Sequence, residues 1–390
     1  MTKIKVHSLT GRIDMRLMET AFKNVKRNRG ASGVDKVSVE MFNQNRKDNL
    51  LALMRELKTR HAFQPKPLRR VHIPKGPGSK KTRPLGIPVV RDRVAQEVIR
   101  LLIAPIFEKM FHESSFGFIP GRNCHMAIEG VLAHHADGYR TVLDADIQGF
   151  FDNIPHKVIM DAVAAEVADG NVLGIIQRFL AAGVMEDGVF KPTNVGTPQG
   201  GVISPLLANI VLNRLDWELE EAGYRFVRYA DDFVVACRDK RQAHEALKLV
   251  RRVLETELGL NLSPEKTHVT TYGKGHEFLG FKLSSRSRRI RKKSVQKFKD
   301  RIRQITVRKY NLDAELIRKL NQVIRGTANY FGKPDFSTCR WLFVKLDSWI
   351  RMRLRCMRLK RKNYNDNGVI SDKWFTKKHG LVTLEEFCIN

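Results

Sequence analysis

Two adjacent acidic residues interrupt the most strand-like stretch of the chain. Asp231 and Asp232 stand between two apolar, β-prone runs at 226–229 and 233–236. Such runs around a short polar turn predict a β-hairpin with both carboxylates at its tip. Adjacent carboxylates repel each other and are costly to desolvate, so a divalent cation is expected beside them. Because Mg²⁺ prefers carboxylate and phosphate oxygens, the hairpin predicts a metal site with a nucleotide substrate. The alternative is an ordinary turn, in which Asp is common.

Charge is distributed unevenly along the 390 residues. The formal net charge is +29, and residues 284–362 alone hold 25 Lys and Arg against 5 Asp and Glu. A basic block interleaved with apolar positions at helical spacing indicates a nucleic-acid contact surface. A solvated helix face and a membrane-surface segment are the alternatives, but a solvated face usually mixes charges of both signs. Length favours two or three domains.

The cysteines and the N-terminus exclude some classes of protein. The first residues contain no apolar stretch typical of a signal peptide, and no apolar run has the length of a membrane span. No pair of cysteines stands at the spacing of zinc ligands, which predicts a reduced, cytoplasmic protein without a zinc-containing nuclease module. The five cysteines are Cys124, Cys237, Cys339, Cys356 and Cys388.

A second acidic cluster follows another apolar run. Residues 141–143 read as the start of a strand, and Asp144, Asp146 and Asp152 come next. A two-metal site needs carboxylates from separate strands, so this cluster is a candidate partner of the Asp-Asp hairpin. The alternative is that Asp caps a following helix, and both readings can hold for different Asp residues in the cluster.

Two glycine-rich or basic loops are further candidates for ligand contacts. Residues 68–74 and 83–88 read as two strands around a Gly/Pro/Lys turn, and such a cationic tip can fold over a triphosphate. An ordinary surface turn is the alternative. Residues 196–205 form a Gly/Pro loop that opens an apolar helix, where backbone N–H groups can approach a ligand closely.

Helical periodicity and capping residues predict most of the remaining elements. The expected helices cover 17–26, 49–61, 94–111 with a break at Pro105, 157–167, 172–182, 206–222, 241–258, 295–307, 314–331 and 341–359. A short apolar strand is expected at 277–281. The last three helices carry the basic block.

Taken in order, these motifs resemble those of a reverse transcriptase, and more narrowly a bacterial group II intron-encoded one. The resemblance spans about residues 15–360. It rests on the basic hairpin and on the segments 29–35, 115–122, 143–152, 197–210, 229–232, 266, 278–280 and 320–326. It implies an α+β, right-hand polymerase fold with a helical thumb or maturase domain. The implied domains are an N-terminal extension (1–67), fingers (68–140), palm with part of the fingers (141–283), thumb (284–362) and a tail (363–390).

The resemblance also implies roles for individual residues. Asp146, Asp231 and Asp232 match the catalytic carboxylates, with Asp146 and Asp231 as the main metal ligands. Asp146 is preferred to Asp144 because Phe151 then falls at the steric-gate position, which favours deoxynucleotides. The other implied site residues are Ile147 as a further metal ligand; Lys266 near the leaving pyrophosphate; Lys75 (or Lys80 or Lys81), Arg83, Phe151, Gln199 and Gly200 for the nucleotide; Phe278, Leu279 and Gly280 as primer grip; and Arg122, Lys292, Lys293, Lys297, Arg301 and Arg325 for nucleic acid.

Such an enzyme would copy an RNA template into DNA from dNTPs with two Mg²⁺ ions, or Mn²⁺ in their place, and would hold an RNA–DNA duplex. No His/Cys-rich nuclease module follows the thumb, so we expect no endonuclease domain. A compact intron reverse transcriptase and a relative serving the host, for example in anti-phage defence with a non-coding RNA, both fit. Two alternative functions are an RNA-directed RNA polymerase and an RNA-binding splicing factor. Phe151 argues against the RNA polymerase, and the intact set of acids argues against a purely RNA-binding role.

Overall fold

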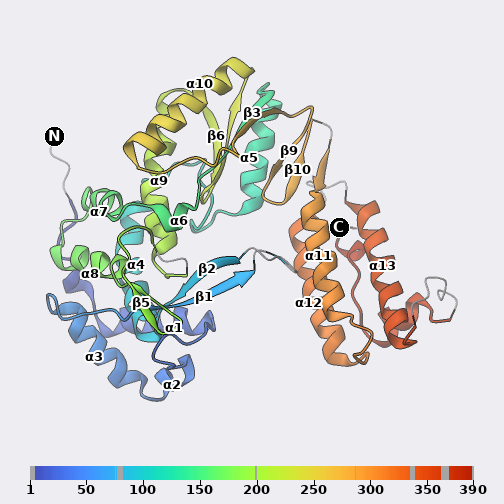
Figure 1. Ribbon diagram of the computed structural model, residues 1–390, viewed down its shortest axis with the longest axis horizontal. Helices are drawn as coiled ribbons and strands as arrows, with labels where there is room; N and C mark the ends of the chain where they lie inside the picture. Colours follow the sequence, from blue (N-terminus) through green and yellow to red (C-terminus); the bar gives the residue numbers. More distant parts are fainter. Residues whose placement is uncertain are drawn as a thin grey trace. The chain divides into compact units, whose positions relative to one another are not determined.

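The protein is described by a computed structural model, which covers residues 5–74, 76, 82–197, 200–285, 287–333, 339–361 and 369–388 (Figure 1). Contacts divide these residues into two compact units. The first holds the residues up to Ile73 and from Thr82 to Thr270. The second holds those from Thr271 onward, with Pro74 and Gly76. Each unit is described by itself.

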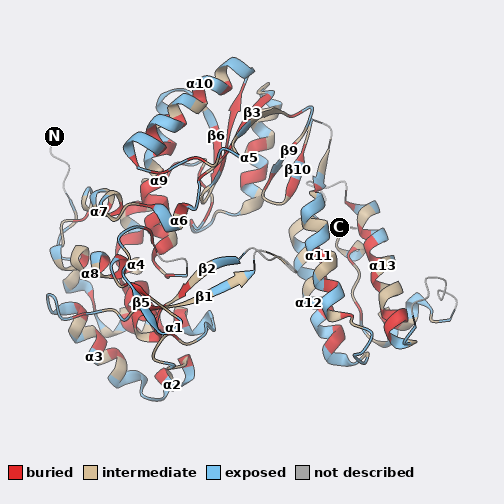
Figure 2. Cartoon of the chain, viewed as in Figure 1, coloured by how far each residue is buried: buried red, intermediate tan, exposed pale blue. Residues whose placement is uncertain are grey.

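The N-terminal part of the first unit is helical. Side chains cap two of its helices: Asp14 accepts from the backbone N–H of Leu17 at 2.8 Å, and Ser38 accepts from that of Met41 at 3.1 Å. Such caps satisfy N–H groups that a helix start leaves unpaired. The helices are η1 (Thr10–Arg12), α1 (Met15–Arg27), α2 (Val39–Gln44), α3 (Arg46–Lys58) and α4 (Val90–Phe107). The helix α4 packs against α1 and is buried along most of its length (Figure 2).

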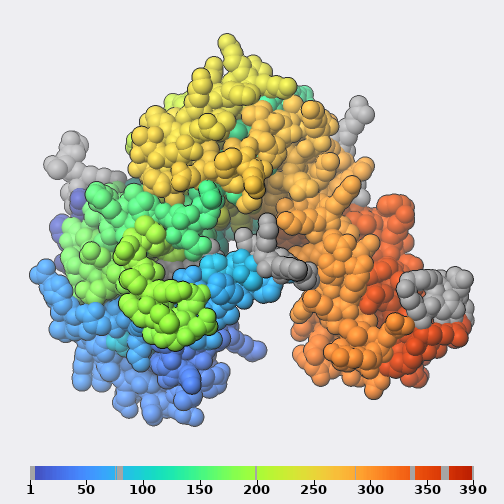
Figure 3. All heavy atoms as spheres, viewed as in Figure 1, coloured from blue at the N-terminus to red at the C-terminus, as the bar shows by residue number. Residues whose placement is uncertain are grey.

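A four-stranded sheet, in the order β2-β1-β4-β5, joins segments far apart in the sequence. Its strands are β1 (Leu68–Pro74), β2 (Thr82–Ile87), β4 (Val184–Glu186) and β5 (Val189–Lys191). The strand β1 runs parallel to β4, and the two segments lie side by side on the surface in Figure 3. The predicted pairing of the two basic strands is confirmed.

A second sheet, in the order β6-β7-β3-β8, holds both acidic clusters. Its strands are β3 (Thr141–Asp146), β6 (Arg225–Tyr229), β7 (Asp232–Cys237) and β8 (His268–Thr271). The strand β7 pairs antiparallel with both β6 and β3, so the predicted hairpin and its partner strand are confirmed. The helices α5 (Cys124–Ala136) and α10 (Lys240–Arg251) pack against this sheet (Figure 1).

Four helices and a π-helical turn complete the first unit. They are α6 (Phe150–Asn153), α7 (His156–Ala164), α8 (Gly170–Leu180), α9 (Ser204–Glu221) and η2 (Arg252–Glu257). The helix α9 has eleven buried residues, which include the polar Ser204, Asn209 and Asp216 (Figure 2). Polar residues in a buried helix need partners, and those of Asn209 and Asp216 lie near the active-site candidates.

The second unit has its own small sheet and helical core. The strands β9 (His276–Phe278), β10 (Phe281–Leu283) and β11 (Arg288–Ile290) form an antiparallel sheet. The helices are α11 (Lys292–Ile305), α12 (Ala314–Phe331), α13 (Arg340–Arg358), η4 (Trp374–Lys378) and η5 (Glu385–Cys388). Apolar residues of α11, α12, α13 and the tail form a separate hydrophobic cluster. The predicted α+β class, with a helical C-terminal region, is confirmed.

Two predicted elements are wrong in detail. The helix α4 does not break at Pro105 but ends two residues later, since a proline so near the end removes a bond from the last turn only. The stretch 277–281 is not one strand. Leu279 and Gly280 have φ of 46° and 85° and make a tight turn between β9 and β10.

Over the described residues, no helix is both long enough and apolar enough to cross a membrane.

Candidate active site

Backbone pairing brings the two acidic clusters together. Asp146 is the last residue of β3 and stands directly opposite Asp232, the first residue of β7. Asp231 precedes Asp232 in the turn between β6 and β7. Like charges directly opposite each other on paired strands are destabilising, and their Cβ atoms lie only about 4.5–5.5 Å apart in such pairs. This concentration of carboxylates therefore needs positive charge nearby.

Lys266 supplies positive charge to Asp146. Its Nζ donates to the two carboxylate oxygens of Asp146 at 3.1 and 2.8 Å. The loop that carries Lys266 is fixed to the end of β3, because the backbone N–H of Ser263 donates to the carbonyl of Asp146 at 2.8 Å. Ile147, the predicted further metal ligand, forms an isolated bridge with Leu262 in the same loop.

The environment of the acids changes two pKa values. Burial raises the pKa of Asp231, and the nearby charge of Asp146 raises it further. The hydrogen bond to Asp146 raises the pKa of Lys266. As they stand, the His, Cys, Asp and Glu side chains of the described residues form no group of three or more that would hold a metal ion. Asp146 is bonded to the ammonium of Lys266 instead.

The turn before Asp231 has an unusual backbone. Ala230 has φ of 59°, in the left-handed region that side chains with a Cβ rarely adopt. The segment 114–117 runs along this turn: the N–H of Phe116 donates to the carbonyl of Arg228 at 2.8 Å. A Cβ added to Gly117 would lie 2.3 Å from the backbone nitrogen of Ala230, so only glycine permits this close approach.

A buried polar network holds the same turn. The guanidinium of Arg228 is fully buried and donates to Asp216 and to Asn209 of α9, the latter at 2.8 Å. It also donates to the carbonyl of Ala230 at 2.9 Å. Asn209 in turn donates to the carbonyl of Gly117 at 2.8 Å. One network therefore joins α9, the 114–117 segment and the Ala230 turn.

Sequence reasoning missed this network. Its signal was present: Arg228 interrupts an apolar strand, and Asn209 and Asp216 stand seven residues apart, on one face of an otherwise apolar helix. A charged residue in a buried strand needs a partner of opposite charge.

The structure describes three of the predicted nucleotide-binding residues, Phe151 in α6, Arg83 on β2 and Gly200 in the loop that packs on β2. Phe151 is half-buried, packs edge-on against Phe150 with ring centroids 5.3 Å apart, and accepts a hydrogen bond at its carbonyl from the N–H of Thr197 at 2.7 Å. Arg83 is exposed on β2. A Cβ at Gly200 would lie 2.5 Å from the carbonyl oxygen of Gly86, so the loop packs tightly on β2. Lys75, Lys80, Lys81 and Gln199 lie outside the described residues.

The predicted primer grip lies in the second unit. Phe278 ends β9, and Leu279 and Gly280 form the turn. The hydroxyl of Tyr330 in α12 donates to the carbonyl of Leu279 at 2.8 Å, which fixes this turn to the helices.

The predicted nucleic-acid contacts divide into two groups. Five are exposed on helices of the second unit, namely Lys292, Lys293, Lys297 and Arg301 on α11 and Arg325 on α12. Arg122 differs, because its Nη1 donates to the carbonyls of His112 and Ser115, both at 2.5 Å. Its guanidinium therefore braces the loop before α5.

Comparisons with known proteins show which family the chain belongs to. Residues 73–283 match the family model described as reverse transcriptase (RNA-dependent DNA polymerase), and residues 295–379 match that of the group II intron, maturase-specific domain. Protein YkfC of Escherichia coli (strain K12) is 35% identical over 67% of this chain and 76% of its own length. Group II intron-encoded protein LtrA of Lactococcus lactis subsp. cremoris is 27% identical over 80% of this chain and 68% of its own length. The chain therefore belongs to the reverse transcriptase family, as an RNA-directed DNA polymerase of the group II intron type with a maturase domain.

Proposed function

We propose that the protein copies an RNA template by nucleotidyl transfer at Asp146, Asp231 and Asp232. The observation that carries this proposal is the register of β3 and β7, which sets Asp146 opposite Asp232 with Asp231 beside them. Three carboxylates at one end of a sheet are the hard oxygen donors that Mg²⁺ prefers. For the metal to bind, the carboxylate of Asp146 would exchange the ammonium of Lys266 for the ion.

Two Mg²⁺ ions, when bound, would activate the primer 3′-hydroxyl and stabilise the leaving oxygen. The protein's own contribution is position and charge. Asp146 and Asp232, on two paired strands, and Asp231, in the turn, would hold the ions. Lys266, released from Asp146, would lie free to neutralise the charge that develops on the departing pyrophosphate.

Phe151 and Arg83 are proposed to select and hold the incoming nucleotide. The ring of Phe151 is fixed from one side by Phe150, and its backbone by Thr197. An aromatic ring at this place leaves no room for a 2′-hydroxyl and favours dNTPs. The exposed guanidinium of Arg83, with Lys75, would clasp the triphosphate.

The second unit is proposed to hold the template–primer duplex. Exposed Lys and Arg side chains on α11 and α12 suit contacts to phosphates, which fix the duplex without reading its sequence. Since each phosphate contact releases counterions, affinity should fall steeply as salt rises.

Primer extension on an RNA template tests the proposal. We expect DNA synthesis from dNTPs with Mg²⁺, and loss of synthesis but not of RNA binding in Asp231→Asn and Asp232→Asn. A matched control is Asp239→Asn, which changes an acid at the N-cap of α10. Undiminished synthesis in both active-site variants would overturn the assignment of the acids.

A second candidate function is support of RNA splicing, favoured by the maturase-domain match over residues 295–379. A splicing factor needs the RNA-binding surface but not the acids. A splicing assay with Asp231→Asn separates the two functions: splicing retained without DNA synthesis would show that RNA maturation stands on its own.

A further inference from the structure

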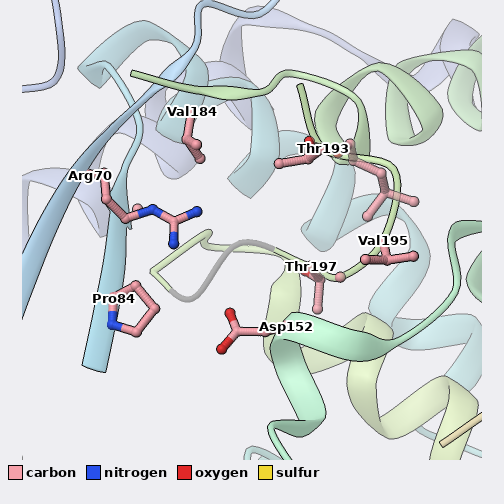
Figure 4. A pocket seen from close by; sticks show the side chains of 10 residues that line it. Arg70, Pro84, Asp152, Val184, Thr193, Val195 and Thr197 are labelled. Carbon is pink, nitrogen blue, oxygen red and sulfur yellow. Dashed lines mark hydrogen bonds between the residues drawn. The ribbon is translucent and has the colours of Figure 1, made fainter. Parts of the chain in front are cut away.

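A pocket of about 290 Å³ lies in the first unit, and none of the roles above uses it (Figure 4). Its walls come from β1, β2, α6, the end of α8, β4 and the segment 193–197. The residues that matter for its chemistry are Arg70, Asp152 and Thr197, with Pro84, Val184 and Val195 as apolar walls. A cavity of about 150 Å³ is enough for one benzene ring, so this pocket has room for a two-ring base.

Two polar atoms at the pocket wall are buried without a partner. Among the described residues, neither the Nε of Arg70 nor the Oγ1 of Thr197 makes a hydrogen bond. Thr197 is only 1% exposed. Buried polar groups are normally paired, so two unpaired polar atoms in one cavity indicate a ligand that forms hydrogen bonds with them.

The pocket is preformed by backbone contacts. The N–H of Thr197 is bonded to the carbonyl of Phe151, and the hydroxyl of Thr193 donates to the carbonyl of Leu180 at 2.9 Å. Parallel pairing of Leu68 with Val184 fixes β1 to β4. A preformed site binds without first ordering its own walls.

The lining suits a nucleobase. In Figure 4 the guanidinium of Arg70 and the carboxylate of Asp152 point toward the middle of the pocket, and the apolar Pro84, Val184 and Val195 lie around it. A base carries acceptors and donors on its edge and apolar faces above and below. Arginine donates to the carbonyl and ring-nitrogen acceptors of bases, and a carboxylate accepts from their amino groups.

The position of the pocket indicates which base it takes. Asp152 follows Phe151 in the chain, and Thr197 is bonded to Phe151, so the pocket adjoins the residue proposed to close on the incoming sugar. The incoming base has its own edge occupied by pairing with the template. The unpaired base closest to that pair belongs to the template strand, one or two nucleotides ahead of the copied position. We propose that this pocket binds that unpaired template base, an inference that rests on the proposed function.

A binding measurement with templates that each lack one base tests the inference. The full chain is titrated with an RNA template–DNA primer duplex that has a four-nucleotide 5′ template overhang, without dNTPs. Each overhang nucleotide is replaced in turn by an abasic one. We expect one abasic position to raise the Kd about five- to 150-fold, the range of one good base contact.

Pocket variants identify where that base binds. Thr197→Val, which keeps the shape of the side chain, and Arg70→Gln should each raise the Kd for the intact template. In both, the abasic substitution should then have less than a two-fold further effect. Arg16→Gln, which removes an equal charge from the exposed side of α1, should keep the full abasic effect. Thermal unfolding of each variant reports folding, and the near-isosteric Thr197→Val keeps the test usable if Arg70→Gln is unstable.

Three results decide the inference. It is overturned if no overhang position matters, or if the abasic effect is unchanged in both pocket variants. It is also overturned if the pocket variants weaken the binding of GMP, titrated without template, but leave the Kd for the intact template unchanged, since the ligand would then be a free nucleotide. Primer extension is measured separately: absent DNA synthesis with an intact abasic effect would count against the catalytic proposal alone.

Discussion

Arg228 and Asp216 form a fully buried, bidentate ion pair. The Nε of Arg228 donates to one carboxylate oxygen of Asp216 at 2.7 Å, and Nη2 donates to the other at 2.5 Å. The same guanidinium donates to the carbonyl of Ala230, one residue before Asp231. The pair therefore connects the helix α9 to the backbone that positions a proposed catalytic acid.

The first prediction separates folding from positioning at this pair. Arg228→Met alone should destabilise the first unit by about 3–5 kcal/mol, because it leaves the charge of Asp216 buried and unpaired. The double variant Arg228→Met/Asp216→Leu should regain most of that stability. Both should lose roughly ten- to a hundred-fold in the rate of nucleotide incorporation, because misplaced catalytic groups are costly and the Ala230 carbonyl has lost its donor. Urea unfolding and single-turnover extension measure the two effects.

A stable double variant with the wild-type rate would mean that the pair serves folding only. The pair of Arg100 and Glu97 on α4, replaced by Met and Leu, is the control for removing charge from this unit. Its rate should stay close to that of the wild type.

The second prediction concerns the close approach of Gly117 to the same turn. In Gly117→Ala the new methyl group would meet the backbone of Tyr229 and Ala230, which cannot move without moving Asp231. We expect at least a ten-fold loss of incorporation rate with RNA binding retained. Gly170→Ala is the matched control, since a Cβ there meets nothing within 4 Å. Equal rates in the two variants would contradict the prediction.

Much of the fold could be predicted from the sequence, for local reasons. The hairpin of β6 and β7 follows from alternating apolar runs around two acids, and α12 runs over Ala314–Phe331 as periodicity predicts. The turn at Leu279 and Gly280 could not be predicted in this way. Short apolar runs do not reveal a turn inside them, particularly where a leucine adopts positive φ.

The residues of the candidate site also differ in whether the sequence alone could predict them. Asp146, Asp231 and Asp232 stand in short motifs whose order along the chain predicts them as catalytic residues. The contacts of Arg228 with Asp216 and Asn209, and the pocket of Arg70 and Thr197, join residues that lie far apart in the sequence. No local pattern specifies such contacts; they follow from sheet register and from which face α9 buries.

The third prediction tests whether Mg²⁺ displaces the ammonium of Lys266 from the carboxylate of Asp146. Lys266→Gln removes the ammonium that occupies the carboxylate of Asp146. The Mg²⁺ concentration at half-maximal rate should therefore fall, because the ion no longer competes with a cation. The maximal rate should also fall, about ten-fold or more, since the developing charge on pyrophosphate loses a partner. Extension rates across a Mg²⁺ titration give both numbers. Lys248→Gln, an exposed lysine on α10, should change neither, and an unchanged Mg²⁺ requirement in Lys266→Gln would contradict the exchange.

The fourth prediction concerns sugar selection by Phe151. Its ring is half-buried and held by Phe150, so Phe151→Val opens space without removing a fully buried core residue. We expect the preference for dNTPs over rNTPs to fall at least ten-fold, chiefly because kcat/KM for rNTPs rises. Phe22 on α1 is also 2% exposed, so Phe22→Leu serves as control: it should lower stability but leave the sugar preference unchanged. Competition between a dNTP and its rNTP on one RNA template measures the ratio directly. A Phe151→Val enzyme that still excludes rNTPs would contradict the prediction and would place the sugar gate at another residue of the nucleotide site.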